Sequence, residues 1–365
     1  MAGPLTGVRV LEFAGAAPTA YVGTVLSGLG ADVVRIDRAP GTTSGTAPGP
    51  DAPRPGENPL SRGRRSVALD LKSPEGVERA LALAEHADIL VEGFRPGVAD
   101  RLGIGPEAAL ARNPRLVYGR VSGWGQQGAW AGRAAHDLAV LALTGALDTD
   151  PATGDPVLPP TAYLSSFAGG ANAHVQGLLA ALHERERSGR GQVVDTALAD
   201  GAALIATLVH QWRRAPGIHT VTDAPHYSLY RAADGGHLAV AAIEPKLYGS
   251  LLDQLGLTGA EELPDRADPA AWPALRALIA ERFAARDRDH WVKVFDAVDA
   301  GVAPVLTAAE AAGHHQLAAR GAFVPVGDSV QPAPASRFGR TPAGAPGRAP
   351  LPGEHTEEVL AEWRG

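Results

Sequence analysis

The pattern of apolar and polar positions over residues 7–122 predicts alternating strands and helices. Short apolar, β-branched runs are typical of buried strands. The segments between them begin near a proline and end near a glycine or histidine, as helices often do. The predicted strands are residues 7–13, 32–37, 66–71, 88–92 and 115–122, and the predicted helices are residues 19–29 and 73–86. Strand, helix, strand in this order implies a parallel sheet, so this part is predicted to be an α/β domain.

The rest of the chain follows a different pattern. Apolar residues at helical spacing predict long helices over residues 163–187 and 193–212. Residues 225–243 read as a strand, a turn at Asp234-Gly235-Gly236 and a second strand. Further helices are predicted over residues 245–255, 271–285, 289–298 and 357–363. A smaller α+β domain is therefore expected after the large α/β domain.

The composition and the distribution of charged and apolar residues argue against several classes of function. The 365 residues carry a net charge of −7, which argues against nucleic acid as a partner because phosphate binding needs a basic surface. The absence of cysteine excludes disulfides and a thiol nucleophile. The pair His314-His315 has no carboxylate at ligand spacing, so no metal site is expected. No apolar run approaches the ~20 residues that cross a bilayer, and the start has no signal-peptide pattern. A cytoplasmic protein without a membrane partner is expected.

Seven motifs, in order over most of the chain, resemble the class III CoA-transferase family. They occupy residues 4–12, 29–38, 65–73, 92–98 (Glu92-Gly93-Phe94-Arg95-Pro96-Gly97-Val98), 122–126 (Ser122-Gly123-Trp124-Gly125-Gln126), 184–195 and 242–245 (Ala242-Ile243-Glu244-Pro245). Within this family, Ala135-His136-Asp137 resembles the α-methylacyl-CoA racemase branch. The transferase branch typically has an aromatic residue where His136 stands.

The resemblance implies a Rossmann-like large domain and a smaller α+β domain joined by two linkers. It also implies two subunits threaded through one another as an interlocked homodimer. The expected parts are a large CoA-binding domain over residues 1–195, a linker helix over 196–224, the small domain over 225–312, a return linker over 313–330, and a segment over 331–365 that packs back on the large domain. The acyl group is expected between one subunit's large domain and the other's small domain.

Racemisation next to a thioester needs a base on one face of the α-carbon, an acid on the other, and stabilisation of the enolate oxygen. The resemblance assigns the base to His136, whose type has a pKa near neutrality, with Glu244 as its partner across the dimer interface. Ser166 stands where the racemases have an aspartate, and a hydroxyl is a poor acid or base at neutral pH. Ser166 is most simply a helix N-cap, and Asp137 is a reserve carboxylate. The amides of residues 166–170 are expected to stabilise the enolate oxygen.

Several functions are compatible with the replacement of one catalytic base. The expected function is racemase-like proton transfer at the α-carbon of an acyl-CoA. A non-racemising isomerase, lyase or decarboxylase on the same scaffold is the first alternative. A CoA-transferase with a displaced nucleophile and a CoA-binding homologue without activity are the others. One-sided chemistry predicts that deuterium enters from D₂O faster than optical activity is lost. The acyl group, and the choice between CoA and a carrier protein, stay open.

Four arginines are candidates for the 3′-phosphate and diphosphate of CoA, because a guanidinium offers forked donors to such groups. They are Arg38, Arg62, Arg65 and Arg95, and for Arg62 a solvated loop is an equal alternative. Gly125 and Gln126 are expected to form a tight turn near the thioester, with a plain loop as the competing interpretation. No cofactor is expected beyond coenzyme A as part of the substrate.

Overall fold

The computed structural model describes residues 2–38, 56–147, 155–159, 163–212, 221–260 and 262–363. The chain divides into two compact units: unit 1 is Met1–Thr207 with His315–Gly365, and unit 2 is Leu208–His314. Each unit has a hydrophobic core of its own. Residues 213–220 of the predicted linker helix lie outside the described residues. Among the described helices, none combines the length and the apolar character that a membrane span requires.

Unit 1 contains a six-stranded parallel sheet in the order β3-β2-β1-β4-β5-β6. Its strands are β1 (Arg9–Phe13), β2 (Asp32–Arg38), β3 (Arg65–Leu69), β4 (Ile89–Glu92), β5 (Val117–Ser122) and β6 (Val193–Ala197). From β1 the chain winds outward to β3 on one side, and from β4 it winds outward to β6 on the other. This doubly wound order confirms the predicted parallel α/β arrangement.

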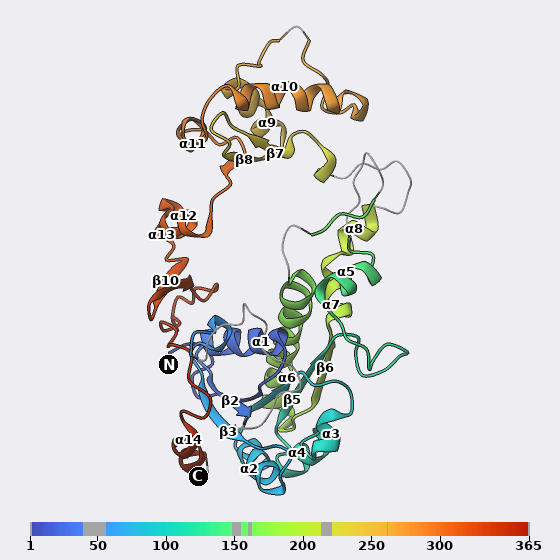
Figure 1. Ribbon diagram of the computed structural model, residues 1–365, viewed down its shortest axis with the longest axis vertical. Coiled ribbons are helices and arrows are strands. Elements are labelled where there is room, and N and C mark those ends of the chain that lie inside the picture. The colour runs from blue at the N-terminus through green and yellow to red at the C-terminus, as the bar shows by residue number, and fades with distance from the viewer. Residues whose placement is uncertain are drawn as a thin grey trace. The chain divides into compact units, whose positions relative to one another are not determined.

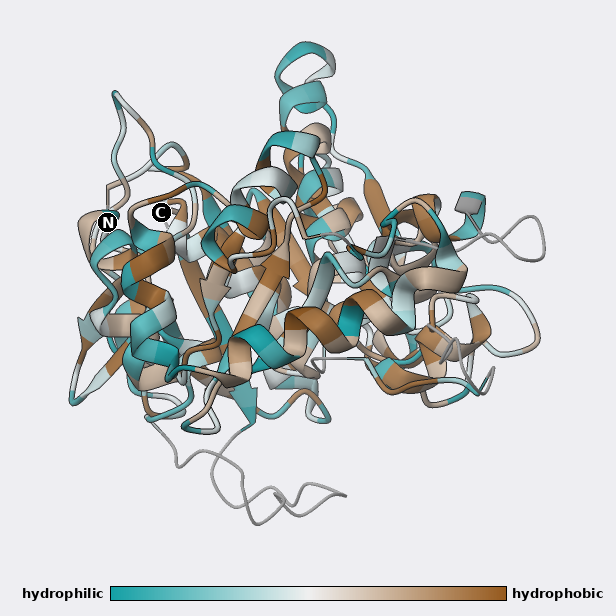
Figure 2. Ribbon diagram, turned by 90° about the horizontal axis from the view of Figure 1, so that it is seen from above, coloured by the Kyte–Doolittle hydropathy of each residue, from teal (hydrophilic) through white to brown (hydrophobic). Residues whose placement is uncertain are grey.

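Helices cover both faces of the sheet, because successive strand residues point to opposite sides. Val10 and Val33 pack with helices α1 (Ala17–Gly28) and α6 (Asn172–Ser188). Leu11 and Val34 pack in the opposite layer. That layer contains α2 (Pro74–Glu85), α4 (Pro106–Arg112) and α14 (Thr356–Glu362). Figure 1 shows α1 and α6 on one side of the strands and α2 and α4 on the other. In Figure 2 the central strands are mostly brown, whereas the longer helices alternate between brown and teal.

The prediction of one helix over residues 193–212 is wrong at its start. Val193–Ala197 is the edge strand β6, which pairs in parallel with β5. Its β-branched residues suit a strand. Its backbone groups pair with β5, and the spacing of apolar residues within one segment does not reveal such a distant partner. Helices α7 (Leu198–Ile205) and α8 (Thr207–Trp212) follow.

The predicted helix over residues 163–187 has two parts. It begins as a π-helix, η2 (Leu164–Ala171), and continues as α6. Helices α3 (Val98–Leu102), α4 and α5 (Asp137–Leu143) were not predicted, because five to seven residues are too few for a clear helical period. Unit 1 also contains η1 (Pro59–Ser61), α13 (His315–Ala319), β10 (Phe323–Val326) and β11 (Ser329–Pro332).

Two glycines allow η2 and α7 to cross with their backbones in contact. A Cβ atom on Gly201 would lie 2.5 Å from the carbonyl carbon of Gly169, closer than real Cβ contacts. Glycine is therefore required at this crossing by close approach rather than by an unusual backbone angle. The crossing determines where η2, which carries Ser165 and Ser166, lies beside α7.

Unit 2 contains the predicted hairpin. Strands β7 (Tyr227–Arg231) and β8 (His237–Ala241) pair in antiparallel fashion, and β9 (Val302–Pro304) adds to β8. Residues of three helices pack with the hairpin in one apolar core. These helices are α9 (Pro245–Gln254), α10 (Trp272–Ala284) and α11 (Arg288–Asp296). The shorter elements are η3 (Val221–Asp223), η4 (Pro269–Ala271) and α12 (Ala308–Gly313).

Candidate active site

A pocket of about 810 Å³ lies at the carboxyl edge of the sheet in unit 1. It is lined by residues 16–19 after β1, residues 93–96 after β4, residues 121–123 at the end of β5, and residues 133–138 around the start of α5. The helices that follow β1 and β4 cover opposite faces of the sheet. Such switch points are where open α/β sheets bind their ligands.

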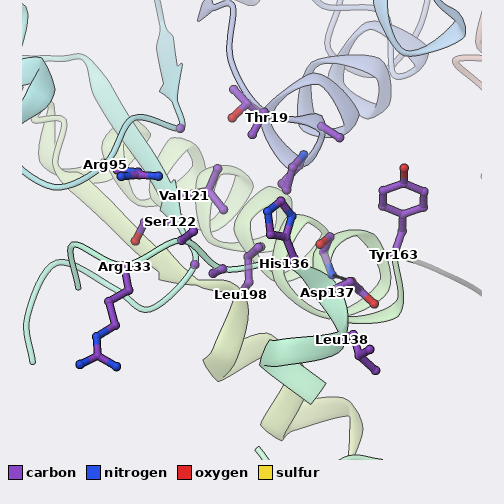
Figure 3. A pocket seen from close by; sticks show the side chains of 18 of the residues that line it. Thr19, Arg95, Val121, Ser122, Arg133, His136, Asp137, Leu138, Tyr163 and Leu198 are labelled. Atoms are coloured by element: carbon purple, nitrogen blue, oxygen red, sulfur yellow. Dashed lines mark hydrogen bonds between the residues drawn. The ribbon is translucent and has the colours of Figure 1, made fainter. Parts of the chain in front are cut away.

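His136 reaches the pocket from the start of α5. It is the N-cap residue of this helix in an extended conformation (φ −105°, ψ 154°), and its carbonyl accepts the amide of Val140. The side chain is exposed and makes no capping bond. In Figure 3 its ring lies in the part of the pocket below α1, which carries Thr19. An exposed imidazole in a pocket is accessible to a bound molecule.

Asp137 connects the start of α5 to η2. Its Oδ1 accepts the Ser165 hydroxyl at 2.7 Å and the Ser166 amide at 2.8 Å. Both serines are buried, and Ser166 lines the pocket together with Asp137. The interpretation of Ser166 as an N-cap is wrong, because η2 begins at Leu164 and its N-cap residue is Tyr163. The carboxylate that binds this end of η2 comes from a residue almost thirty positions earlier.

The amides at the start of η2 are less available than expected. The Ser166 amide donates to Asp137, and the Phe167 amide donates to the Tyr163 carbonyl at 2.8 Å. The start of α1 is different, because its N-cap residue Ala16 forms no side-chain cap and the first-turn amides of a helix lack intrahelical partners. Thr19 lines the same pocket, and its Oγ1 is buried without a partner in the described part of the chain.

Tyr163 forms part of the pocket wall in a strained conformation. It has φ 70°, the left-handed region that non-glycine residues rarely adopt. Its ring stacks on Phe167 with centroids 4.6 Å apart, and Phe167 stacks on Tyr21 of α1 at 4.6 Å. The stack joins the start of η2 to α1. Of its three rings, that of Tyr163 belongs to a residue that lines the pocket.

A row of charges crosses three strands next to the pocket. Glu92 on β4 lies opposite Arg120 on β5, and Arg120 lies opposite Asp195 on β6. Glu92 is buried, and its Oε2 accepts the Phe94 amide at 2.6 Å. Burial raises the pKa of Glu92 to about 7, although the Phe94 amide and Arg120 oppose the shift. Glu92 shapes the segment that carries Arg95 into the pocket.

We expect Glu92→Gln to remove part of the pH dependence of stability. The folded pKa lies above the unfolded value near 4.5, so the folded state retains this proton and its contribution is fully present below pH 4.5. That contribution is lost as pH rises through about 7. Relative to the variant, the unmodified protein should lose about 1–3 kcal/mol between pH 4.5 and 8. Thermal unfolding at several pH values measures the difference, and parallel profiles would contradict the shift.

The four candidate arginines lie in different places. Arg95 lines the pocket and is exposed. Arg38 is exposed at the end of β2. Arg62 donates to the Gln331 side chain at 3.0 Å and does not line the pocket. Arg65 lies at the opposite end of its strand from the pocket edge, where it pairs with Asp32, Glu358 and Glu362. Only Arg95 thus joins His136, and the assignment of the other three to CoA phosphates stays a prediction.

The turn at Gly125 and Gln126 lies just beyond the pocket wall. Gly125 has φ 83°, a value that favours glycine, and Gly123 two residues earlier lines the pocket. Farther along this loop, Arg133 lies over the Trp130 ring at 4.6 Å and lines the pocket. Sequence patterns gave no signal for Arg133, Thr19 or Tyr163, because none belongs to a motif with a recognised chemical role. Ser165 was overlooked beside Ser166.

Glu244 belongs to unit 2. It is the N-cap residue of α9, with Pro245 following, and its side chain is exposed and forms no capping bond. The carbonyl of Ile243, one residue earlier, accepts a hydrogen bond from Arg266 at 3.2 Å. The Arg266 guanidinium also lies 4.5 Å from the centre of the Tyr248 ring, so Arg266 connects the backbone beside Glu244 to helix α9. The carboxylate is therefore available to a partner, and its pairing with His136 stays a prediction.

Comparison with known proteins shows the family of the chain. The model of CoA-transferase family III matches residues 5–356. The chain is 41% identical to α-methylacyl-CoA racemase of Mus musculus, with 98% of this chain and 93% of the relative covered. It is 28% identical to the succinyl-CoA–L-malate CoA-transferase β subunit of Chloroflexus aurantiacus, with 99% and 94% covered. A crystal structure of a CaiB/BaiF family protein from Brucella suis matches all of both chains with a TM-score of 0.85 and 26% identity. The chain belongs to CoA-transferase family III.

Proposed function

We propose that this protein transfers protons at the carbon next to the thioester of an acyl-CoA, as a racemase or epimerase. One observation carries the proposal: His136 is exposed at the start of α5 in a pocket at the carboxyl edge of the sheet. The similarity to the mouse racemase supports the reaction class. The transferase branch typically has an aromatic residue where His136 stands, which argues against a CoA-transferase.

His136 begins the reaction in this proposal. Its neutral imidazole takes the α-proton, and the electron pair of the broken C–H bond moves onto the thioester oxygen to form an enolate. Glu244 of the second subunit of a homodimer accepts a hydrogen bond from the other ring nitrogen, fixing the tautomer and favouring the protonated form. A proton added to the opposite face of the α-carbon then inverts the centre.

The start of α1 is the proposed site of the enolate oxygen. Its first-turn amides and the Thr19 hydroxyl border the pocket, whereas the Ser166 amide is already bonded to Asp137. Donors aimed at developing negative charge lower the barrier. Arg95, also in the pocket wall, is proposed to bind a phosphate of CoA.

Exchange with D₂O tests the proposal. Incubation of a single epimer of a 2-methylacyl-CoA should replace the α-hydrogen by deuterium and invert the centre, measured by mass spectrometry and chiral separation. A 2,2-dimethylacyl-CoA, which has no α-hydrogen, is the matched control and should gain no mass. If CoA moved to an added carboxylate without α-deuteration, the protein would be a transferase instead. If neither α-proton exchange nor CoA transfer occurred, a CoA-binding role without catalysis would remain.

A further inference from the structure

The carboxylate of Asp137 is bonded on one side only. The Ser165 hydroxyl and the Ser166 amide both donate to Oδ1. The second oxygen, Oδ2, is buried and accepts no hydrogen bond within the described residues. A buried carboxylate oxygen without a partner is uncommon, because desolvation without compensation costs free energy. Asp137 lines the same pocket as His136, so its side chain borders the candidate active site.

We infer that Asp137 is the second proton-transfer residue of this pocket and supplies the carboxylate that Ser166 lacks. The inference rests on the proposed function and extends it to the opposite face of the substrate. It names the group behind the proposed inversion, in place of the one-sided exchange expected from the sequence, because two groups then serve the two faces of the α-carbon.

The backbone separates the two side chains although the residues are consecutive. His136 is extended and precedes the helix, whereas Asp137 is the first residue of α5. In Figure 3 the His136 ring lies below α1, while Asp137 lies on the side of Tyr163. The hydrogen bonds from Ser165 and Ser166 hold the carboxylate at the start of η2. A substrate whose α-carbon is bound between α1 and the start of η2 would present one face to His136 and the other to Asp137.

The proton balance requires no additional reactant. His136 takes the α-proton and becomes an imidazolium, and the C–H electron pair enters the enolate. The Asp137 carboxyl group gives a proton to the opposite face, where the enolate electrons form the new C–H bond. Asp137 is left ionised and His136 protonated. The reverse reaction, or proton exchange with solvent, restores the starting state.

Serine at position 166 is compatible with this role. Ser166 is buried beside Asp137, and its amide bonds the carboxylate. An aspartate at position 166 would place a second carboxylate next to the first, and adjacent carboxylates disfavour each other's ionised form. With neutral serines around it, Asp137 is the only carboxylate among the residues that line this pocket.

Asp137→Asn tests the inference because an amide oxygen can accept the same two hydrogen bonds but cannot transfer the proton. Starting from each epimer in D₂O, we expect inversion to fall about 100-fold or more. Deuterium exchange from the epimer whose proton faces His136 should stay within a few-fold of the unmodified protein. Adding Ser166→Asp to this variant should restore part of the inversion, because it returns a carboxylate to the start of η2.

Two results would overturn the inference. Asp137→Asn could invert at the rate of the unmodified protein, or it could lose exchange from both epimers equally, which would make Asp137 a positioning residue for His136. An unchanged thermal unfolding midpoint controls for structural damage. Failure of the proposed function is distinguishable, because then the unmodified protein itself would exchange no α-proton.

Discussion

His136→Asn is expected to lower the interconversion of the two epimers by a factor of about 10²–10⁴, the usual contribution of a general acid or base. Asparagine is polar and smaller than histidine, and it takes no proton at neutral pH. Exchange of the α-proton should be lost for the epimer that faces His136. The other epimer, whose proton faces Asp137, should continue to exchange. Rates of deuterium entry and of inversion, measured separately from each epimer, provide the test.

The complementary pattern of the two variants makes this prediction specific. Asp137→Asn and His136→Asn should each remove exchange from one epimer, and not from the same one. His183→Asn is a suitable control, because His183 is exposed on α6 and does not line the pocket. It should change the rates less than about two-fold. An active His136→Asn variant with normal inversion would exclude His136 as the base.

Arg64→Met is expected to destabilise unit 1 by about 3–5 kcal/mol, because it leaves a buried carboxylate without its partner. Arg64 Nε lies 2.9 Å from Glu12 Oε2, and both side chains are buried. The contact is an ion pair without the alignment of a hydrogen bond. Arg64 also donates to the Ala20 and Leu60 carbonyls, so it links β1, α1 and the segment before β3. Urea unfolding followed by tryptophan fluorescence measures the loss.

The dependence on pH distinguishes this cause from simple loss of packing. Burial raises the pKa of Glu12 to about 7, and Arg64 opposes the shift. Without Arg64 the folded state should bind this proton more tightly. The contribution of protonated Glu12 is fully present below its unfolded pKa near 4.5 and is lost as pH rises through the folded value. The penalty of Arg64→Met should therefore be smaller at pH 5 than at pH 8.

Two further variants control the experiment. Glu12→Leu with Arg64→Met should recover most of the lost stability, because apolar replacement of both partners of a buried ion pair is often neutral. Arg79→Met removes an exposed pair with Glu75 one helical turn away and should cost less than about 0.5 kcal/mol. Equal losses of unfolding free energy for Arg64→Met and Arg79→Met would show that the buried pair stabilises the protein no more than the exposed pair.

Prediction from sequence succeeded where the signal is local. The alternation of Val10, Leu11 and Phe13 already indicates a strand, and the strand–helix–strand order indicates a parallel sheet. It failed at Val193–Ala197, where pairing with β5 decides the structure, and at Ser166, where η2 begins earlier than a capping pattern suggests. Arg65 resembles a phosphate ligand in sequence, yet three carboxylates surround it in space.

The sequence by itself determined the fold class, the family resemblance, and the presence of His136 opposite a missing aspartate, because strand periodicity and contiguous motifs are properties of neighbouring residues. Only the tertiary structure decided which groups converge on the pocket. Asp137 meets Ser165 and Ser166 after an interval of 28 and 29 residues. That contact depends on how α5, η2 and α7 pack, and the Gly169–Gly201 crossing controls part of this packing. The spacing of residues along the sequence does not predict which distant residues come into contact, because the packing of the whole core determines the course of the chain between them.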